Sequence, residues 1–232
     1  MTAKTAKSVT ITDDGAVHVS GLLQAPPRAR ACYVLAHGAG AGMRHPFMAA
    51  VAEELAARGI ATLRYQFPYM ERGAKRPDPP ALAHAAVRAA VAEARRLVPK
   101  LPLIAGGKSF GGRMTSQTQA EAPLAGVRGL AFLGFPLHAA GKPSQDRAKH
   151  LFDTKVPMLF LQGTRDTLAL PDEIVPLCKK LGRRATLKLF ADADHSFRVP
   201  ARSGRKDAEV LGEVLDTLAA WIDRIVAAAA KP

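Results

Sequence analysis

Short apolar runs alternate with longer amphipathic stretches along most of the chain. The strand-like runs lie at 31–36, 60–65, 103–106, 129–135, 156–162 and 186–190. The stretches with helical periodicity lie at 46–58, 81–98, 110–121, 173–181 and 206–229. Continuously apolar runs are typical of parallel strands that helices cover on both faces. The alternation therefore predicts an α/β fold with a mostly parallel, doubly wound sheet and active groups at the carboxyl ends of its strands.

The first part of the chain departs from this pattern. Ser8–Ile11 and Ala16–Leu23 alternate polar and apolar residues around the turn sequence Asp13-Asp14-Gly15, and Pro26-Pro27 follows them. Such alternation around a tight turn predicts an N-terminal antiparallel hairpin.

Two further segments carry no regular pattern. The loop 66–80 is rich in Pro, Arg and Lys and is too long for a simple connection, so we expect it to be functional or mobile. Segment 137–151 is polar with one turn signal and predicts a small, lid-like insertion. No repeat or long linker divides the 232 residues, which predicts one domain over 1–232.

Composition narrows the class of protein. The residues are 48% hydrophobic and 23% charged, which is enough for a full core. The sequence shows neither a signal peptide nor an uncharged apolar run of about 18 residues, so no membrane association is expected. Only two cysteines occur, Cys32 and Cys178, which we expect to be buried thiols in a reducing cytoplasm.

The formal net charge of +13 raises the question of an acidic partner. The basic residues are scattered, many of them in Ala-rich helices, and no helix-turn-helix, zinc or RNA-binding pattern accompanies them. We therefore expect a basic, solvated surface and no nucleic-acid site. An anionic small-molecule substrate stays open, because a positive field would steer it.

A Gly-x-Ser-x-Gly motif is the strongest local signal for chemistry. Gly107-Lys108-Ser109-Phe110-Gly111 follows an apolar strand and opens an amphipathic helix. This strand–turn–helix setting is that of a nucleophile elbow, where glycines prevent collisions around a strained serine. The alternative is a Gly-rich turn in which Ser109 only caps the helix.

A serine nucleophile needs a base and a carboxylate that orients the base. His195 lies directly after the last predicted strand, although a surface-loop histidine is the simpler interpretation of this residue alone. Asp166 follows the strand 156–162, whereas Asp192 and Asp194 are too close to His195 in sequence to be its first-choice partner. All three catalytic candidates thus follow strands, in the chain order Ser…Asp…His that α/β-hydrolases use.

A loop of small residues follows the strand 31–36 in His37-Gly38-Ala39-Gly40-Ala41-Gly42. Small residues let backbone N–H groups approach a substrate oxygen, so we predict an oxyanion hole. Its donors are the N–H of Phe110 and that of Ala39, with Gly40 as a competitor, and His37 braces the loop. The loop fits neither phosphate-binding motif, and no metal-binding pattern occurs, so no metal or cofactor is expected.

Four apolar residues follow strands at the same edge, and we expect them to line an acyl pocket unless they pack in the core. These residues are Phe67, Tyr69, Phe135 and Leu137. Lys108 is unusual because it places a cation beside the nucleophile. Together with Arg113 and the basic loop Arg72–Arg76 it favours an anionic substrate, or its stem simply lies over the surface.

With these residues in place the chain resembles an α/β-hydrolase. It is most similar to a small subgroup, related to dienelactone hydrolases, that includes the testis-expressed 30 and KAT8 regulatory complex subunit 3 hydrolase domains. The resemblance rests on LAHGAGAGMRHPFM, LRYQFPY, GGKSFGGRM, GFPLH, LFLQGTRD and ADHSF. It implies the triad Ser109, Asp166 and His195, the oxyanion loop 37–42 and a minimal lid. Dienelactone hydrolases carry cysteine where Ser109 stands, so lactone hydrolysis of that type is not carried over.

The sequence therefore predicts a serine hydrolase that cleaves a carboxylic ester or thioester through an acyl-enzyme intermediate. The rival hypothesis is a catalytically idle interaction protein with the same fold, since fold alone does not fix function. The retention of three catalytic residue types in order favours the enzyme.

Overall fold

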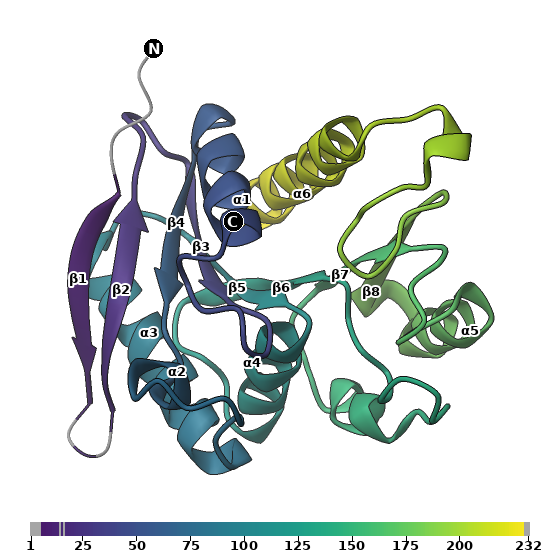
Figure 1. Ribbon diagram of the computed structural model, residues 1–232. Coiled ribbons are helices and arrows are strands. Elements are labelled where there is room, and N and C mark those ends of the chain that lie inside the picture. The colour runs from purple at the N-terminus through teal and green to yellow at the C-terminus, as the bar shows by residue number, and fades with distance from the viewer. Residues whose placement is uncertain (1–5, 14, 16, 230–232) are drawn as a thin grey trace.

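The computed structural model describes residues 6–13, 15 and 17–229, and its strands form one eight-stranded sheet (Figure 1). The strands are β1 (Lys7–Thr12), β2 (His18–Gln24), β3 (Ala31–Ala36), β4 (Ile60–Tyr65), β5 (Leu103–Lys108), β6 (Val127–Leu133), β7 (Met158–Gly163) and β8 (Ala185–Phe190). Their order in the sheet is β1-β2-β4-β3-β5-β6-β7-β8. Every pair from β4 to β8 is parallel, whereas β1–β2 and β2–β4 are antiparallel. The predicted parallel sheet with an N-terminal antiparallel hairpin is confirmed.

The hairpin turn is described only in part, because Asp14 and Ala16 lie outside the described residues. Asp13 Oδ1 accepts hydrogen bonds from the N–H groups of Gly15 at 3.0 Å and Val17 at 2.8 Å. This side chain thus supplies the acceptors that the turn needs.

Helices cover both faces of the sheet. α1 (Pro46–Ala57) and α6 (Asp207–Ala229) pack on one face, and α3 (Pro80–Leu97), α4 (Phe110–Glu121) and α5 (Pro171–Leu181) on the other (Figure 1). The shorter helices are α2 (Pro68–Glu71) and the 3₁₀ helices η1 (Asp146–Phe152), η2 (Gly182–Arg184) and η3 (Ala201–Ser203). None of the helices in the described ranges is long and apolar enough to cross a membrane.

Two predicted segments differ from the structure. The loop 66–80 contains the short helix α2, which has Pro68 at its start and is too short to show helical periodicity. The strand expected at 129–135 is β6, which begins at Val127 and ends before Gly134, where φ is 73°. A positive φ turns the chain out of the extended conformation, so β6 ends earlier than its apolar run.

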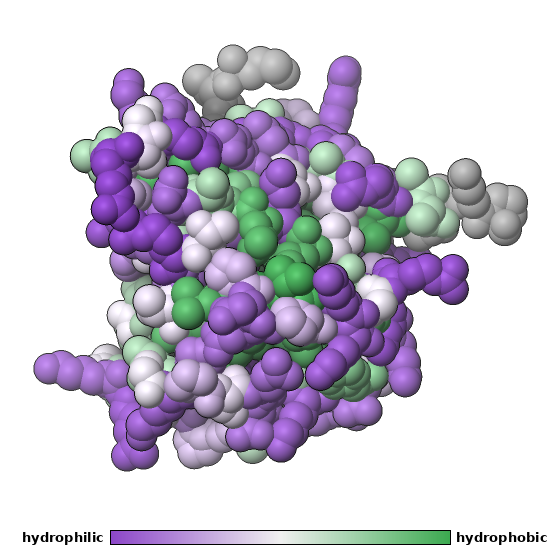
Figure 2. Space-filling model, turned by 90° about the vertical axis from the view of Figure 1, so that its right-hand side faces the viewer, coloured by the Kyte–Doolittle hydropathy of each residue, from purple (hydrophilic) through white to green (hydrophobic). Residues whose placement is uncertain are grey.

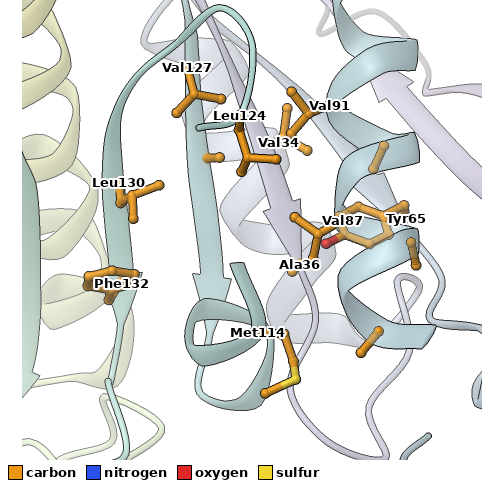
Figure 3. Close-up of a cluster of buried hydrophobic side chains, with 14 of the residues drawn as sticks. Val34, Ala36, Tyr65, Val87, Val91, Met114, Leu124, Val127, Leu130 and Phe132 are labelled. Atoms are coloured by element: carbon orange, nitrogen blue, oxygen red, sulfur yellow. The ribbon is translucent and has the colours of Figure 1, made fainter. Parts of the chain in front are cut away.

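Alternate residues of β3 face two separate cores. Cys32, Val34 and Ala36 belong to the cluster that includes α3 and α4, and Figure 3 shows part of it with Val87 and Met114. The intervening residues of the strand belong to the cluster with α1 and α6. Because both faces of β3 are buried, every position must be apolar, which explains its continuous apolar run.

β8 forms one edge of the sheet, on the right-hand side of Figure 1. Its Leu187 and Leu189 are only partly buried. Figure 2 faces this side and shows apolar residues gathered at its centre among hydrophilic ones. The catalytic candidates do not lie on this exposed edge; they follow the carboxyl ends of the parallel strands.

Candidate active site

Ser109 lies in the sharp turn between β5 and α4. Its backbone has φ 50° and ψ −115°, an unfavourable conformation for a residue with a Cβ atom. Such strain persists only where the surroundings enforce it, and it is characteristic of functional sites. The conformation matches the elbow that the motif predicts.

The flanking glycines explain how the turn is enforced. A Cβ atom on Gly107 would lie 2.2 Å from the carbonyl oxygen of Ala36, and one on Gly111 would lie 2.6 Å from that of His37. Both distances are impossible for real atoms, so β5 and α4 approach β3 this closely only because these positions are glycine. The close approach places Ser109 beside the small-residue loop that follows β3.

Asp166 and His195 are brought together although they follow different strands. Asp166 Oδ2 lies 2.6 Å from His195 Nδ1. A carboxylate at this nitrogen makes Nδ1 the protonated one and leaves Nε2 as the basic nitrogen. The pair has the geometry of a base and the group that orients it.

Asp166 is fully buried and is held by three donors. Besides His195, the side-chain amide of Gln162 donates to it at 2.5 Å and the N–H of Leu168 at 3.0 Å. Sequence reasoning did not single out Gln162. The sequence feature that could have indicated Gln162 is its amide side chain in the otherwise apolar run of β7, because a buried polar group needs a hydrogen-bond partner.

The loop that carries His195 is held by Asp194 and Phe197. Asp194 Oδ1 accepts hydrogen bonds from the N–H groups of Ser196 at 2.7 Å and Arg198 at 2.9 Å. The Phe197 ring packs between the rings of Phe47 and Phe190. Asp194, which was not the first-choice partner of the imidazole, therefore orders the loop backbone, and the carboxylate at His195 Nδ1 is that of Asp166.

Lys108 is buried behind the nucleophile, and its Nζ donates to the carbonyl oxygen of His195 at 2.6 Å. Burial lowers the pKa of Lys108 to about 8, while the carboxylates of Asp166 and Asp194 oppose this shift. The charged end of this lysine thus points into the protein and joins the turn at Ser109 to the histidine loop. Nothing in the local sequence reveals this contact, since the two segments are 87 residues apart.

The ring of His37 braces the loop after β3. His37 Nε2 accepts from the N–H of Phe67 at 3.1 Å, and its Nδ1 donates to Gly38 O at 2.7 Å. Burial lowers the pKa of His37 to about 4, which keeps it neutral at neutral pH. His37 thus occupies the bracing position that was expected of it.

The N–H of Gly40 donates to the hydroxyl of Tyr69 at 2.8 Å. In contrast, the N–H groups of Ala39 and Phe110 have no acceptor among the described residues. Phe110 is the first residue of α4, where N–H groups lack helical partners and the helix dipole favours negative charge. Of the two competing loop donors, Ala39 is therefore the one available to a ligand.

Two clefts of about 370 Å³ meet at Ser109 and share Ala39 and Leu168. We call the first the His195 cleft, because His195 lines it together with Lys108 and the apolar side chains of Phe47 and Met48. The second, the Arg113 cleft, is lined by Phe110, Met114, Pro136, Arg113 and Arg147. A substrate whose carbonyl reaches Ser109 can extend into both clefts.

The four apolar residues expected to line an acyl pocket do not line either cleft. Phe67, Tyr69, Phe135 and Leu137 are all 0% exposed and belong to the core. Phe67 packs against His37 and Phe110, and Phe135 packs against Phe132 and Phe160. The chain turns inward after β4 and β6, so the pocket prediction for these four residues is wrong and core packing is correct.

Comparison with known proteins agrees with the fold. Residues 29–223 match a family described as "Alpha/beta hydrolase domain". Among solved structures, a dienelactone hydrolase from Anabaena variabilis is 22% identical with a TM-score of 0.77, covering 94% of this chain and 97% of that chain. An α/β serine hydrolase without lid from Xanthomonas campestris is 20% identical with a TM-score of 0.71, covering 95% and 97%. A Pyrococcus furiosus esterase is 19% identical with a TM-score of 0.69, covering 91% and 90%.

Proposed function

Because the chain belongs to the α/β-hydrolase family and is thus an enzyme of the hydrolase class, we propose that it is a serine hydrolase of carboxylic esters or thioesters. The observation that carries the proposal is the strained Ser109 on one cleft with His195, whose Nδ1 lies 2.6 Å from the buried Asp166. This combination is what an activated serine requires. The similar structures include a dienelactone hydrolase, a serine hydrolase and an esterase, which accords with the proposal.

In the proposed mechanism, Ser109 Oγ attacks the carbonyl carbon while His195 Nε2 takes the hydroxyl proton. Asp166 holds the imidazole and stabilises the imidazolium that forms. The N–H groups of Phe110 and Ala39 bind the oxyanion. Loss of one such donor typically raises the barrier by about 2.7–4 kcal/mol.

The tetrahedral intermediate then collapses as His195 gives its proton to the leaving oxygen or sulfur, which leaves an acyl group on Ser109. A water molecule, deprotonated by His195, attacks this acyl group and releases the acid. Both half-reactions use the same base and the same oxyanion donors. The segment 137–151, with η1, borders the Arg113 cleft through Arg147, and we propose that it serves as the minimal lid.

The test is hydrolysis of 4-nitrophenyl esters and matched alkyl thioesters of increasing acyl length. We expect turnover by the wild type and loss of about a millionfold in kcat in Ser109→Ala. Ser8→Ala is the matched control, because Ser8 is exposed on β1 at the far edge of the sheet. Turnover by folded Ser109→Ala at the wild-type rate would place the nucleophile elsewhere, and absence of turnover by the wild type on every ester and thioester would refute the proposal.

A further inference from the structure

Arg113 is a partly buried cation without a counter-charge. Within the part of the chain that the structure describes, no acceptor or carboxylate pairs with its guanidinium, and its Nε is buried without a partner. Burial and the nearby charge of Arg147 lower its pKa. The guanidinium carbon lies 5.7 Å from the centre of the Phe110 ring, which holds the group against the floor of the Arg113 cleft.

The neighbouring carboxylates are already engaged. Asp78 also lines this cleft, but its two oxygens bind Arg72 at 2.5 Å and the N–H of Tyr69 at 2.7 Å. Asp146, next to Arg147, pairs with Lys149 at 2.6 Å. Two like charges therefore lie side by side in the wall of a cleft that Ser109 shares. An unpaired buried charge is costly. An anion that enters the cleft therefore supplies the counter-charge and the hydrogen-bond acceptors that the described residues do not provide to Arg113.

The position of His195 decides which part of a substrate meets these arginines. Since His195 must protonate the leaving group, the leaving group lies in the His195 cleft. The acyl group then extends from Ser109 into the Arg113 cleft. The planar guanidinium is suited to bidentate binding of a carboxylate.

We propose that Arg113 and Arg147 form a subsite for a carboxylate at the far end of the acyl group, so that the substrates are monoesters or monothioesters of short dicarboxylic acids. This inference rests on the proposed hydrolase function. It also gives η1 a role, because this helix brings Arg147 to the cleft.

The test compares esters that share acyl length and leaving group but differ in charge. Mono-4-nitrophenyl glutarate and adipate are measured against 4-nitrophenyl pentanoate and hexanoate. We expect wild-type kcat/KM to favour the charged ester of a pair by about tenfold to hundredfold, the usual range for one charged hydrogen-bonded pair. The ratio within a pair is the readout, because damage to folding or chemistry cancels in it.

Arg113→Gln and Arg147→Gln are each expected to lower this ratio about tenfold or more. Arg183→Gln makes the same charge change on η2, beside the amino end of β8 and far from both clefts, and is expected to leave the ratio unchanged. A wild-type ratio near one, or a preference that survives both cleft variants, overturns the subsite while the hydrolase function stands. If the wild type cleaves neither series, the proposed function fails and the subsite with it.

Discussion

Lys108 and Arg113 are two cations on either side of the nucleophile with opposite surroundings. Burial lowers the pKa of both. The Nζ of Lys108 binds the carbonyl of His195 and lies near two carboxylates, Asp166 and Asp194. The charge that acts on the pKa of Arg113 is another guanidinium, that of Arg147.

Lys108 is hydrogen-bonded within the protein, whereas Arg113 has a buried nitrogen without a partner in the described part of the chain, so the first cation stabilises the fold and the second is available to a ligand. The Nζ of Lys108 is hydrogen-bonded to the carbonyl oxygen of His195, so its charge stabilises the histidine loop, while the side chain also lines the His195 cleft. The guanidinium of Arg113 has no counter-charge among the described residues, and an anion in its cleft would supply one. Net charge alone, +13 for the chain, cannot distinguish these two cases.

Among the changes that bear on this comparison, the largest effect is expected from removing the Asp166 carboxylate, which lies against His195 and near Lys108. Asp166→Asn should lower kcat by about ten thousandfold, because an amide no longer selects the imidazole tautomer with a basic Nε2. Asp172→Asn, on the exposed first turn of α5, is the matched control. Steady-state kinetics on a 4-nitrophenyl ester make the measurement, and a loss of only a few fold would remove Asp166 from the triad.

Lys108→Met tests the cation that belongs to the fold. We expect kcat to fall by about tenfold to hundredfold, with a smaller change in KM, because the histidine loop loses a charged hydrogen bond. Lys100→Met changes an exposed lysine at the opposite end of β5 and should have no effect. An unchanged kcat, or a drop in charged-ester preference equal to that of Arg113→Gln, would make Lys108 a substrate-binding residue instead.

The two cations also differ in how they couple stability to pH. The pKa of Lys108 is about 8 in the fold and 10.5 in the unfolded chain, so the unfolded chain binds more protons between these values. The free energy of unfolding of the wild type relative to Lys108→Met should therefore rise with pH across this window, by a total on the order of 3 kcal/mol. Arginine stays protonated across this pH window, so the difference in free energy of unfolding between the wild type and Arg113→Met should not change with pH. Urea unfolding from pH 7 to 10.5 measures both differences. If the difference for Lys108→Met stays constant or falls as the pH rises, Lys108 is not buried as a cation.

Salt should produce the smallest effect and act on one cation only. The Arg113 cleft is open to solvent, so raising ionic strength from about 0.05 to 0.5 M should reduce the preference for charged esters two- to fivefold, roughly as screening predicts. The ratio of kcat between wild type and Lys108→Met on a neutral ester should not change, because that contact is buried. A salt-independent ester preference would argue against an electrostatic subsite.

Much of the fold follows from the sequence for a physical reason. Strands such as β3 are apolar at every position because both faces are buried, and this pattern is visible without the structure. The placement of Ser109, Asp166 and His195 after strands follows from the same pattern, since parallel strands end at one edge. The family match supports the prediction of the fold.

The pocket was not predictable in the same way. Phe67 and Phe135 follow strands just as Ser109 does, yet the chain turns them into the core, and only the path of the loop decides between the two outcomes. Arg113 was visible in the motif, but its lack of a partner depends on Asp78 and Asp146 being engaged elsewhere. Such information is spread over segments distant in sequence. The closer resemblance to the testis-expressed 30 subgroup stays a prediction.

Covalent labelling tests the central claim most directly. A fluorophosphonate forms a stable bond only with an activated serine, so the protein is incubated with the probe, digested, and the modified peptide is located by mass spectrometry. We predict one adduct on Ser109, absent from Ser109→Ala and retained by Ser8→Ala. An unlabelled wild type at neutral pH, or an adduct on any other residue, would contradict the account.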